Sequence, residues 1–272
     1  MRLKLNQRQK GLLMEFKKRA YSFDWDDNIL FMPTQIHLEK KVGSKWVPVS
    51  ISTEEFRDVR NDIGDKYRYV DNSIIKSFQD FRNFDAFIKD TKEALSKKSF
   101  GPSFNKFVEA LMYGNDFSII TARGNPPNAI KEGIKIIIDT VFTDKQKETM
   151  LSNLHGSTIE EYLSLQDYYP VTSTEFIKDF DAESSVTNPE VGKMIALKNF
   201  VERVVNAVKK IKDDPTYRGI SIGFSDDDLG NIESAELYIE EELKSLYPEV
   251  NFLVYDTSDP KNPKKKRIII KK

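Results

Sequence analysis

Four short apolar runs alternate with helical stretches along the chain, and this alternation restricts the possible folds more than any other feature. The runs lie at residues 20–23, 117–120, 219–224 and 251–255. Apolar runs of this length between turn residues are typical of strands that are buried on both faces. Strands that alternate with helices predict a parallel sheet. We therefore expect an α/β fold with a doubly wound, Rossmann-like parallel sheet and helices on both of its faces.

The intervals between the apolar runs carry the periodicity of amphipathic helices. Proline and glycine mark several boundaries, because neither residue continues a helix well. At Asn188-Pro189 the proline falls in the first turn of a helix, where its missing N–H is tolerated. The predicted helices lie at residues 7–19, 84–113 with a break at Gly101-Pro102, 126–138, 189–211 and 231–246.

Three carboxylates follow the first apolar run within four residues, at Asp24, Asp26 and Asp27. Asp24 lies where the strand leaves the sheet, and Asp26 is one pleat further on, so both side chains point the same way while the chain stays extended. Two such charges about 4 Å apart repel by roughly 4 kcal/mol at an effective dielectric constant of about 20. That repulsion is tolerated where a cation lies between the carboxylates or where one of them keeps a proton. Both arrangements are typical of phosphoryl chemistry.

Polar residues also end two of the other strands. Thr121 follows the second apolar run, and Asp226 and Asp227 follow the third. Lys193 lies near the start of the helix that leads into the third run. In open α/β sheets ligands bind at the carboxyl ends of the strands. We therefore expect Asp24 and these residues to surround one crevice.

The order of these elements resembles the haloacid-dehalogenase-like (HAD) hydrolase superfamily. Over residues 19–31, 116–140 and 186–256 the chain is similar to the core of that superfamily. Its first motif usually has Thr or Val two residues after the second aspartate, where this chain has Asn28. The resemblance implies a Mg²⁺-dependent phosphatase that hydrolyses a phosphomonoester through an aspartyl-phosphate. The four motifs that carry the resemblance are Phe23-Asp24-Trp25-Asp26, Ile119-Ile120-Thr121, Lys193 and Gly223-Phe224-Ser225-Asp226-Asp227.

The resemblance implies a role for each motif residue. Asp24 would be the nucleophile, because a carboxylate that attacks phosphorus divides one difficult displacement into two easier ones. Asp26 would serve as general acid and base, an effect worth roughly 10²–10⁴-fold in rate. Thr121 would donate to a phosphoryl oxygen, and Lys193 would neutralise charge on the phosphoryl group and on Asp24.

The resemblance also implies a Mg²⁺ site. Its ligands would be Asp24, Asp226, Asp227 and the backbone carbonyl of Asp26, since Mg²⁺ takes oxygen ligands and keeps waters and substrate phosphate in its shell. The chain has no cysteine and only two histidines, which excludes cysteine-ligated zinc and histidine-rich metal sites. An all-carboxylate donor set also disfavours zinc.

Two nearby residues are alternatives for these roles. Asp228 could replace Asp227 at the metal, and Lys198 could replace Lys193. The two lysines are more than one helical turn apart, so they face different directions. Lys193 is nearer to the helix start, where the macrodipole favours a phosphate, and we therefore prefer it.

Other kinds of phosphate and hydrolase site do not fit the chain. No glycine-rich P-loop and no dinucleotide-binding fingerprint is present. A Ser-His-Asp hydrolase would need His37 or His155, and neither lies beside a nucleophile elbow. A phosphoacceptor receiver domain has its acidic and threonine strand ends in a different order. A dehalogenase of the same superfamily would lack Asp26, because a leaving halide needs no proton.

The spacing of the motifs predicts an insertion into the core. About 95 residues separate the first two motifs, where a simple βα unit needs about 30. Residues 36–51 alternate like an antiparallel hairpin around Gly43-Ser44-Lys45. In the superfamily, an insertion at this point would be a cap that closes over the site and selects the substrate. We expect a core domain at 1–32 and 113–256 with an extra segment at about 142–186, an inserted cap region at 33–112, and a basic C-terminal tail at 257–272.

Composition limits the partners that the chain would bind. The net charge of −1 over 272 residues gives no overall field toward nucleic acid or membrane. No apolar stretch reaches the length of about 20 residues that a membrane span needs. The absence of cysteine fits a cytoplasmic protein. The expected substrate is a small phosphorylated molecule.

Two further hypotheses accompany the phosphatase. The basic run at residues 261–267 suggests nucleic-acid binding, and with it a 3′- or 5′-phosphatase that processes nucleic-acid ends. The same run could instead be a solvated end, or the terminal Ile268-Ile269-Ile270 could add an edge strand. Asn28 and the large insertions suggest, alternatively, a HAD-fold binding protein without turnover.

Overall fold

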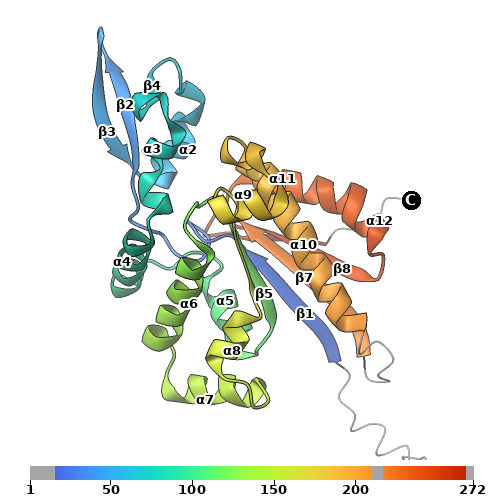
Figure 1. Cartoon of the computed structure of the whole chain (residues 1–272). Coiled ribbons are helices and arrows are strands. Elements are labelled where there is room, and N and C mark those ends of the chain that lie inside the picture. Colours follow the sequence, from blue (N-terminus) through green and yellow to red (C-terminus); the bar gives the residue numbers. More distant parts are fainter. Residues whose placement is uncertain (1–15, 210–216, 268–272) are drawn as a thin grey trace, which may run out of the picture.

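A six-stranded, mostly parallel sheet forms the centre of the chain (Figure 1). The computed structural model describes residues 16–209 and 217–267. Within these residues the strand order is β6-β5-β1-β7-β8-β9, and helices flank the sheet. The predicted α/β class and the mainly parallel sheet are therefore confirmed. The strands are β1 (Phe16–Phe23), β5 (Asp116–Thr121), β6 (Asp167–Pro170), β7 (Tyr217–Asp226), β8 (Val250–Asp256) and β9 (Lys264–Arg267).

The register of the central strands places their carboxyl ends side by side. Phe23, the last residue of β1, pairs with Ile119 of β5 on one side and with Ser225 of β7 on the other. Both pairings are parallel. The residues that follow these strands therefore leave the sheet at the same end, as the apolar runs predicted.

Helices cover the sheet on both faces because successive side chains of a buried strand point to opposite sides. In β1, Tyr21 and Phe23 pack in the cluster that α4 to α8 complete, whereas Ala20 packs in the cluster that α9, α10 and α11 complete. The helices on the first face are α4 (Phe84–Ser96), α5 (Phe104–Met112), α6 (Pro127–Val141), α7 (Asp144–Asn153) and α8 (Ile159–Ser164). Those on the second are α9 (Thr174–Phe180), α10 (Pro189–Lys209), α11 (Leu229–Tyr238) and α12 (Lys244–Leu246), with the short turns η4 (Glu183–Val186) and η5 (Ile239–Leu243).

The first strand is longer than its apolar run predicted. Residues 16–19, expected to belong to a helix over 7–19, are part of β1, and that prediction is wrong for them. The neighbouring strand β7 has ten residues and supplies backbone partners for the part of β1 that precedes its apolar run. Arg19, for example, pairs with Ser221. This tertiary pairing outweighs the weak helical pattern of a short segment. Residues 7–15 lie outside the described part of the chain.

The segment at 142–186 contributes a strand that its sequence did not indicate. Strand β6 pairs in parallel with β5, with Ser118 opposite Asp167 and Thr121 opposite Pro170. It has only four residues and ends in proline, which suits the edge of a sheet but gives little strand signal in the sequence. The extra segment is therefore partly built into the main sheet.

A second, three-stranded sheet lies beyond one end of the main sheet (Figure 1). We call residues 36–82 the small-sheet region. Its antiparallel hairpin turns at Gly43, whose φ of 61° suits glycine, as the sequence predicted. Ile36, Leu38 and Phe81 form the centre of its own apolar cluster. Its elements are β2 (Ile36–Val42), β3 (Lys45–Ile51), α2 (Thr53–Val59), η1 (Arg60–Asp62), β4 (Tyr67–Tyr69), η2 (Val70–Asn72), α3 (Ile74–Ser77) and η3 (Gln79–Arg82).

Helices α4 and α5 belong to the predicted inserted region at 33–112 but pack with the main sheet. The ring of Phe107 in α5 contacts Phe23 of β1 edge to face at 5.3 Å, and Phe87 in α4 lies 5.2 Å from Trp25. The large apolar faces of both helices account for this packing. The part of the insertion with its own core is therefore the small-sheet region.

The basic C-terminal run is ordered at residues 264–267, where β9 pairs antiparallel with β8. Lys266 forms an ion pair with Glu236, and the Lys265 ammonium lies 5.4 Å from the centre of the Tyr255 ring. The predicted strand at Ile268-Ile269-Ile270 falls outside the described residues. Among the helices described, none has the length and apolar character needed to cross a membrane.

Candidate active site

Three carboxylates meet where β1 and β7 end. Asp24, Asp226 and Asp227 each bring one oxygen to within 4.8 Å of the other two, and all three side chains are buried. Asp24 follows β1 directly, and its backbone N–H donates to the carbonyl of Ser225 in the adjacent strand β7 at 2.9 Å. The parallel register of these two strands is therefore what brings together residues about 200 positions apart.

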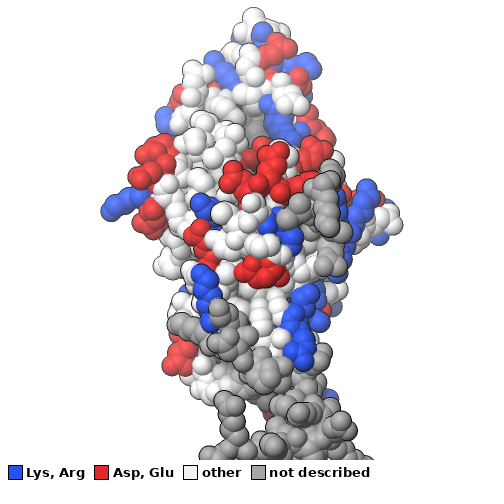
Figure 2. Space-filling view, turned by 90° about the vertical axis from the view of Figure 1, so that its right-hand side faces the viewer, with Lys and Arg blue, Asp and Glu red and all other residues white. Residues whose placement is uncertain are grey.

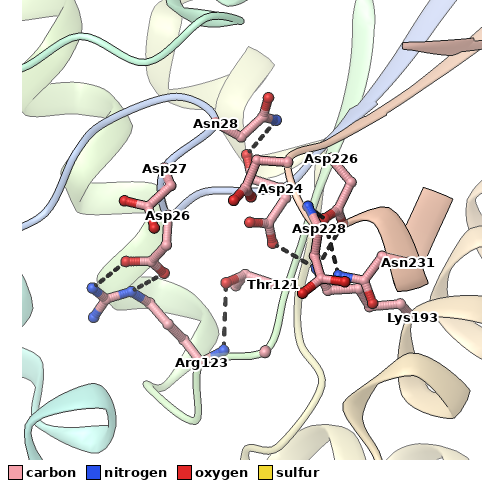
Figure 3. A network of polar contacts seen from close by, with 12 residues as sticks. Asp24, Asp26, Asp27, Asn28, Thr121, Arg123, Lys193, Asp226, Asp228 and Asn231 are labelled. Atoms are coloured by element: carbon pink, nitrogen blue, oxygen red, sulfur yellow. Dashed lines mark hydrogen bonds and ion pairs between the residues drawn. The ribbon is translucent and has the colours of Figure 1, made fainter. Parts of the chain in front are cut away.

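Lys193 completes the cluster from helix α10. Its buried Nζ donates to Oδ1 of Asp24 at 3.0 Å and to Oδ2 of Asp226 at 2.7 Å (Figure 3). Gly192, directly before it, packs closely: a Cβ there would lie 2.8 Å from the Cβ atoms of Val171 and Ser185. The missing side chain thus allows the first turn of α10 to approach the strand ends and to place Lys193 over the carboxylates.

The buried charges shift one another's pKa values. Burial raises the pKa of Asp24 well above its usual value, while Lys193 opposes this and Asp226 adds to it. Burial likewise raises the pKa of Asp227 to about 8, with a further rise from Asp226 and an opposing effect of Arg57. Burial alone would lower the pKa of Lys193, but Asp226 and Asp24 hold it above its usual value. Burial and mutual repulsion therefore favour the protonated forms of Asp24 and Asp227, and an added cation would relieve this repulsion and favour the carboxylates.

The donor set fits a hard divalent cation. The cluster offers three carboxylate oxygens and neither thiolate nor imidazole. Magnesium, calcium and manganese prefer oxygen ligands, and Mg²⁺ is commonly bound by one or two protein carboxylates plus waters and substrate phosphate. Asp24, Asp226 and Asp227 are thus the side chains that would hold Mg²⁺.

Asp26 does not join the three carboxylates but faces Arg123 (Figure 3). Arg123 donates from Nε to Oδ2 and from Nη2 to Oδ1 of Asp26, both at 2.7 Å. The arginine side chain is fully buried, and its guanidinium lies 4.6 Å from the centre of the Phe81 ring. Nη2 also donates to Thr34 Oγ1 at 2.8 Å. The Asp26 carboxylate is therefore held in one orientation.

Asn28 fastens the loop after β1 to the end of β7. Its Nδ2 donates to the carbonyls of Asp24 and Ser225, both at 3.1 Å. Its Oδ1 accepts from Ser225 Oγ at 3.0 Å and from Thr257 Oγ1 at 2.9 Å. These four hydrogen bonds explain how an asparagine holds this loop at the position where the resemblance led us to expect Thr or Val.

The two alternative residues take other places. Asp228 caps α11, since its Oδ1 accepts from the backbone N–H of Gly230 at 2.8 Å, and it pairs with Arg60 at 3.0 Å. It is not one of the three clustered carboxylates. Lys193 lines the cavity described next, whereas Lys198 does not.

The clustered carboxylates lie in a cavity of about 570 Å³. Thr121, buried at the end of β5, lines it together with Asp24, Asp26 and Lys193. The small-sheet region supplies the opposite wall, with the apolar side chains of Ile36, Phe56, Tyr69, Ile74, Phe78 and Phe81. The residues predicted from three strand ends and one helix therefore surround a single crevice.

Residues of α2 reach across this cavity to the acidic strand ends. Arg57 forms an ion pair with Asp227 and lies 3.7 Å from Asp27. Thr53 Oγ1 donates to Asp27 Oδ2 at 2.7 Å. Asp27 has a backbone φ of 55°, and its side chain links the loop after β1 to the small-sheet region.

Sequence reasoning missed several of these residues. Arg57 and Arg60 carry no local signal, because their acidic partners lie 170 and 168 positions away in the chain. The position of Arg123, two residues after Thr121 at a strand end, is the one clue that the sequence offered.

A second polar arrangement lies outside the cavity. The ring of His37 contacts Ser50 Oγ at 2.9 Å through Nδ1 and Asp80 Oδ2 at 2.7 Å through Nε2. The sequence analysis found no nucleophile elbow beside this histidine, and Ser50 indeed lies within strand β3, directly opposite His37 of β2. We interpret the contact as a link between β2, β3 and η3.

The chain was compared with models of protein families, with curated proteins and with solved structures, and none of these comparisons found a match.

Proposed function

We propose that this protein is a Mg²⁺-dependent, HAD-like phosphatase that hydrolyses a phosphomonoester through an aspartyl-phosphate. One observation carries the proposal: Asp24, Asp226, Asp227 and Lys193 meet in a buried cluster at one cavity, at the carboxyl ends of adjacent parallel strands. A cluster of this charge, with a shape that admits an organic ligand, suits the binding and transfer of a phosphoryl group.

Asp24 is the nucleophile in this mechanism. Its carboxylate attacks phosphorus and the bond to the leaving oxygen breaks, which leaves an acyl phosphate on the side chain. Lys193 holds Asp24 at 3.0 Å and stays protonated, so it neutralises charge on the phosphoryl oxygens and keeps the carboxylate oriented. The Thr121 hydroxyl donates to a phosphoryl oxygen. Bound Mg²⁺ would supply further neutralisation of the phosphoryl charge.

Asp26 transfers the protons. As the carboxylic acid it protonates the leaving alkoxide in the first step. The resulting carboxylate then accepts a proton from the attacking water, the bond between the Asp24 oxygen and phosphorus breaks, and Asp26 is protonated again for the next cycle. Arg123 is its positioning residue, because the bidentate contact fixes both carboxylate oxygens. The Asp26 carboxylate stands apart from the clustered carboxylates, which suits a group that contacts the leaving oxygen.

We propose that the small-sheet region acts as a cap on a Rossmann-like core. The support is that it forms one wall of the cavity and that Arg57 and Arg60 contact acidic residues at the opposite side. A cap in this position excludes water from the acyl phosphate until the leaving group has departed.

The test is turnover of p-nitrophenyl phosphate by the purified protein. We expect turnover with Mg²⁺, none with EDTA, and none for Asp24→Asn. Asp139→Asn is the matched control, because Asp139 is exposed on α6 and outside the cavity. Equal rates for wild type and Asp24→Asn would refute the mechanism. A protein that binds Mg²⁺ but leaves a broad panel of phosphomonoesters intact would favour the binding-protein alternative.

Nucleic-acid end processing is the less favoured function. On the face shown in Figure 2, basic side chains are scattered among acidic and uncharged ones. Lys264–Arg267 form β9, with Lys266 paired to Glu236, so part of the basic run serves the fold. Salt-sensitive binding of an oligonucleotide that is lost on deletion of residues 261–272 would reverse this preference.

A further inference from the structure

Arg82 differs from the other basic residues of the cavity. In the described residues, every other lysine or arginine that lines the cavity has a carboxylate within 4.0 Å, and Arg82 has none. Arg82 is the last residue of η3 and of the small-sheet region. The paired residues are Arg57 with Asp227, Arg60 with Asp228, Arg123 with Asp26, and Lys193 with Asp24 and Asp226.

Two hydrogen bonds hold the backbone around Arg82 against the loop that follows β5. The Gly124 N–H donates to the carbonyl of Phe81 at 3.0 Å, and Asn125 Nδ2 donates to the carbonyl of Asn83 at 2.8 Å. Residues 81–83 are therefore fixed beside the same loop that begins with Thr121. The position of Arg82 depends on the main sheet as well as on the small-sheet region.

The guanidinium of Arg82 packs on the backbone of Gly124. A Cβ on Gly124 would lie 2.6 Å from Nη1 of Arg82 and 2.8 Å from its Cζ. Glycine at this position thus leaves room for the guanidinium, three residues after Thr121. A positive charge is therefore held next to the loop on which the phosphoryl group would lie.

Among the described residues, no carboxylate lies at ion-pair distance from Arg82. The side chain is half-buried, and burial lowers its pKa while the more distant Glu175 opposes this effect. A desolvated cation without a partner is unfavourable, and an arriving anion would relieve that penalty. A guanidinium also offers paired N–H donors that match the oxygens of a carboxylate or phosphate.

The space beside Arg82 is larger than a phosphoryl group requires. A volume of about 570 Å³ lies in the range of pockets for organic ligands. Phe56, Tyr69 and Phe78 line the cavity on the same side as Arg82, within the small-sheet region. An organic body would pack against these rings while its two ends met charged groups.

We propose that Arg82 is a specificity-determining residue that binds a second anionic group of the substrate. The substrate class is then a phosphomonoester of small-molecule size with another carboxylate or phosphate attached to an apolar or ring-containing body. This inference rests on the proposed phosphatase function, because it assigns the reacting phosphate to Asp24 and the second anion to Arg82.

The test compares matched substrates that differ by one anionic group. Phenyl phosphate is compared with its 2-, 3- and 4-carboxyphenyl analogues, which tests a carboxylate, and with the corresponding benzene bisphosphates, which test a phosphate. The ratio of kcat/KM for the doubly anionic and singly anionic substrates is measured for each protein. Comparing this ratio between variants cancels the intrinsic reactivity of each ester.

Three variants isolate the contribution of Arg82. Arg82→Gln removes the charge, and Arg82→Lys keeps a charge without the forked donors. Gly124→Ala leaves Arg82 in the chain but displaces its guanidinium. Arg68→Gln is the matched control, because Arg68 is an arginine of the small-sheet region that pairs with Glu39 and does not line the cavity.

We expect Arg82→Gln to lower the substrate ratio by about 10- to 100-fold, the usual effect of losing a hydrogen bond to a charged group. Turnover of phenyl phosphate, which has no second anion, should fall far less than turnover of the doubly anionic esters. Gly124→Ala should lower the ratio in the same direction, Arg82→Lys should lower it less than Arg82→Gln, and Arg68→Gln should leave it unchanged. An equal ratio in wild type and Arg82→Gln, for the carboxylate and for the bisphosphate series, would overturn the inference while the phosphatase function stood.

Failure of the proposed function gives a different result. In that case wild type turns over none of these esters, and calorimetry with the same compounds replaces the rate measurement. Tighter binding of the doubly anionic compounds that is lost in Arg82→Gln would still support the anion site. Equal binding by both proteins would refute it.

Discussion

Arg123 holds both carboxylate oxygens of Asp26, each at 2.7 Å, from a guanidinium that is completely buried. The guanidinium also donates to the hydroxyl of Thr34, and that hydroxyl donates to Asp90 Oδ2 at 2.7 Å. Asp26 is therefore one end of a chain of contacts that runs through the buried Arg123 and Thr34 to Asp90. Its orientation depends on residues from the main sheet, from α4 and from the segment that leads into the small sheet.

Substitution of Arg123 should affect both stability and turnover. Arg123→Met leaves the Asp26 charge without its partner, and loss of one member of a buried ion pair typically destabilises a protein by about 3–5 kcal/mol. Arg123→Lys keeps the charge but not the fork, so kcat should fall with a smaller loss of stability. Urea unfolding and steady-state kinetics measure the two effects. Unchanged kcat in Arg123→Lys would contradict a positioning role.

Asn28→Ala should destabilise the protein by about 2–3 kcal/mol, because it removes the four hydrogen bonds that the buried amide makes with Asp24, Ser225 and Thr257. Urea unfolding monitors the change in free energy. Asn206→Ala, at an exposed position on α10, is the control and should change stability by less than about 0.5 kcal/mol. Similar effects of the two substitutions would show that the Asn28 contacts contribute little.

Lys193→Ala and Lys198→Ala form a matched pair on one helix. Only Lys193 contacts Asp24 and Asp226 in the described structure. Lys193→Ala should therefore reduce kcat by about 10² or more, as expected when a positioned cation is removed from the reacting phosphoryl group. Lys198→Ala should retain wild-type turnover of p-nitrophenyl phosphate. The reverse result would transfer the role to Lys198.

Affinity for Mg²⁺ should rise with pH through the pKa of Asp227, which burial raises to about 8. Below that pH the carboxyl keeps its proton in the metal-free protein, and binding of the cation must release it. Calorimetry at neutral pH in buffers of different ionisation enthalpy measures this release. Arg57→Ala should move the curve to higher pH, since Arg57 opposes the rise in pKa. Binding without proton release would contradict the assignment of Asp227.

The same shift has a consequence for stability. A raised pKa means that folding favours the protonated form of Asp227. Its contribution to the stability of the metal-free protein is therefore complete below the ordinary value of 3.8 and is lost as the pH rises through about 8. The increase in Tm on adding Mg²⁺ should accordingly be larger above pH 8 than in mildly acid solution. An increase that is independent of pH would argue against this linkage.

The elements that the sequence predicted well are those with strong local patterns. The apolar runs of β1, β5, β7 and β8 indicated buried strands, and the parallel arrangement of such strands explains why Asp24 meets Asp226. Strand β6 escaped notice because four residues that include a proline carry little periodicity. The start of β1 was misread because its pairing with β7, and not its own pattern, decides its conformation.

The residues of the site likewise divide into those that a local pattern identifies and those that distant contacts place. Motif positions that directly follow a strand were identifiable, because the strand itself fixes where they point. Arg123, Arg57 and Arg82 were not, since each gains its position from a partner distant in the chain. The hydrogen bonds of Asn28 were equally hidden, as they depend on the register of β1 with β7 and on Thr257 after β8.

Two segments connect the small-sheet region to the rest of the protein, and both contact the loop that follows β5. Thr34 contacts Arg123 at 2.8 Å, and the carbonyl of Phe81 accepts from Gly124 at 3.0 Å. If the small-sheet region moves as the cap that we propose, it would rotate about that loop. Such a rotation would separate Arg57 and Arg60 from their acidic partners, and partly exposed ion pairs of this kind are each worth about 0–1 kcal/mol. If the small-sheet region is the cap that we propose, these ion pairs would offer little resistance to its opening, and higher salt should favour the open form.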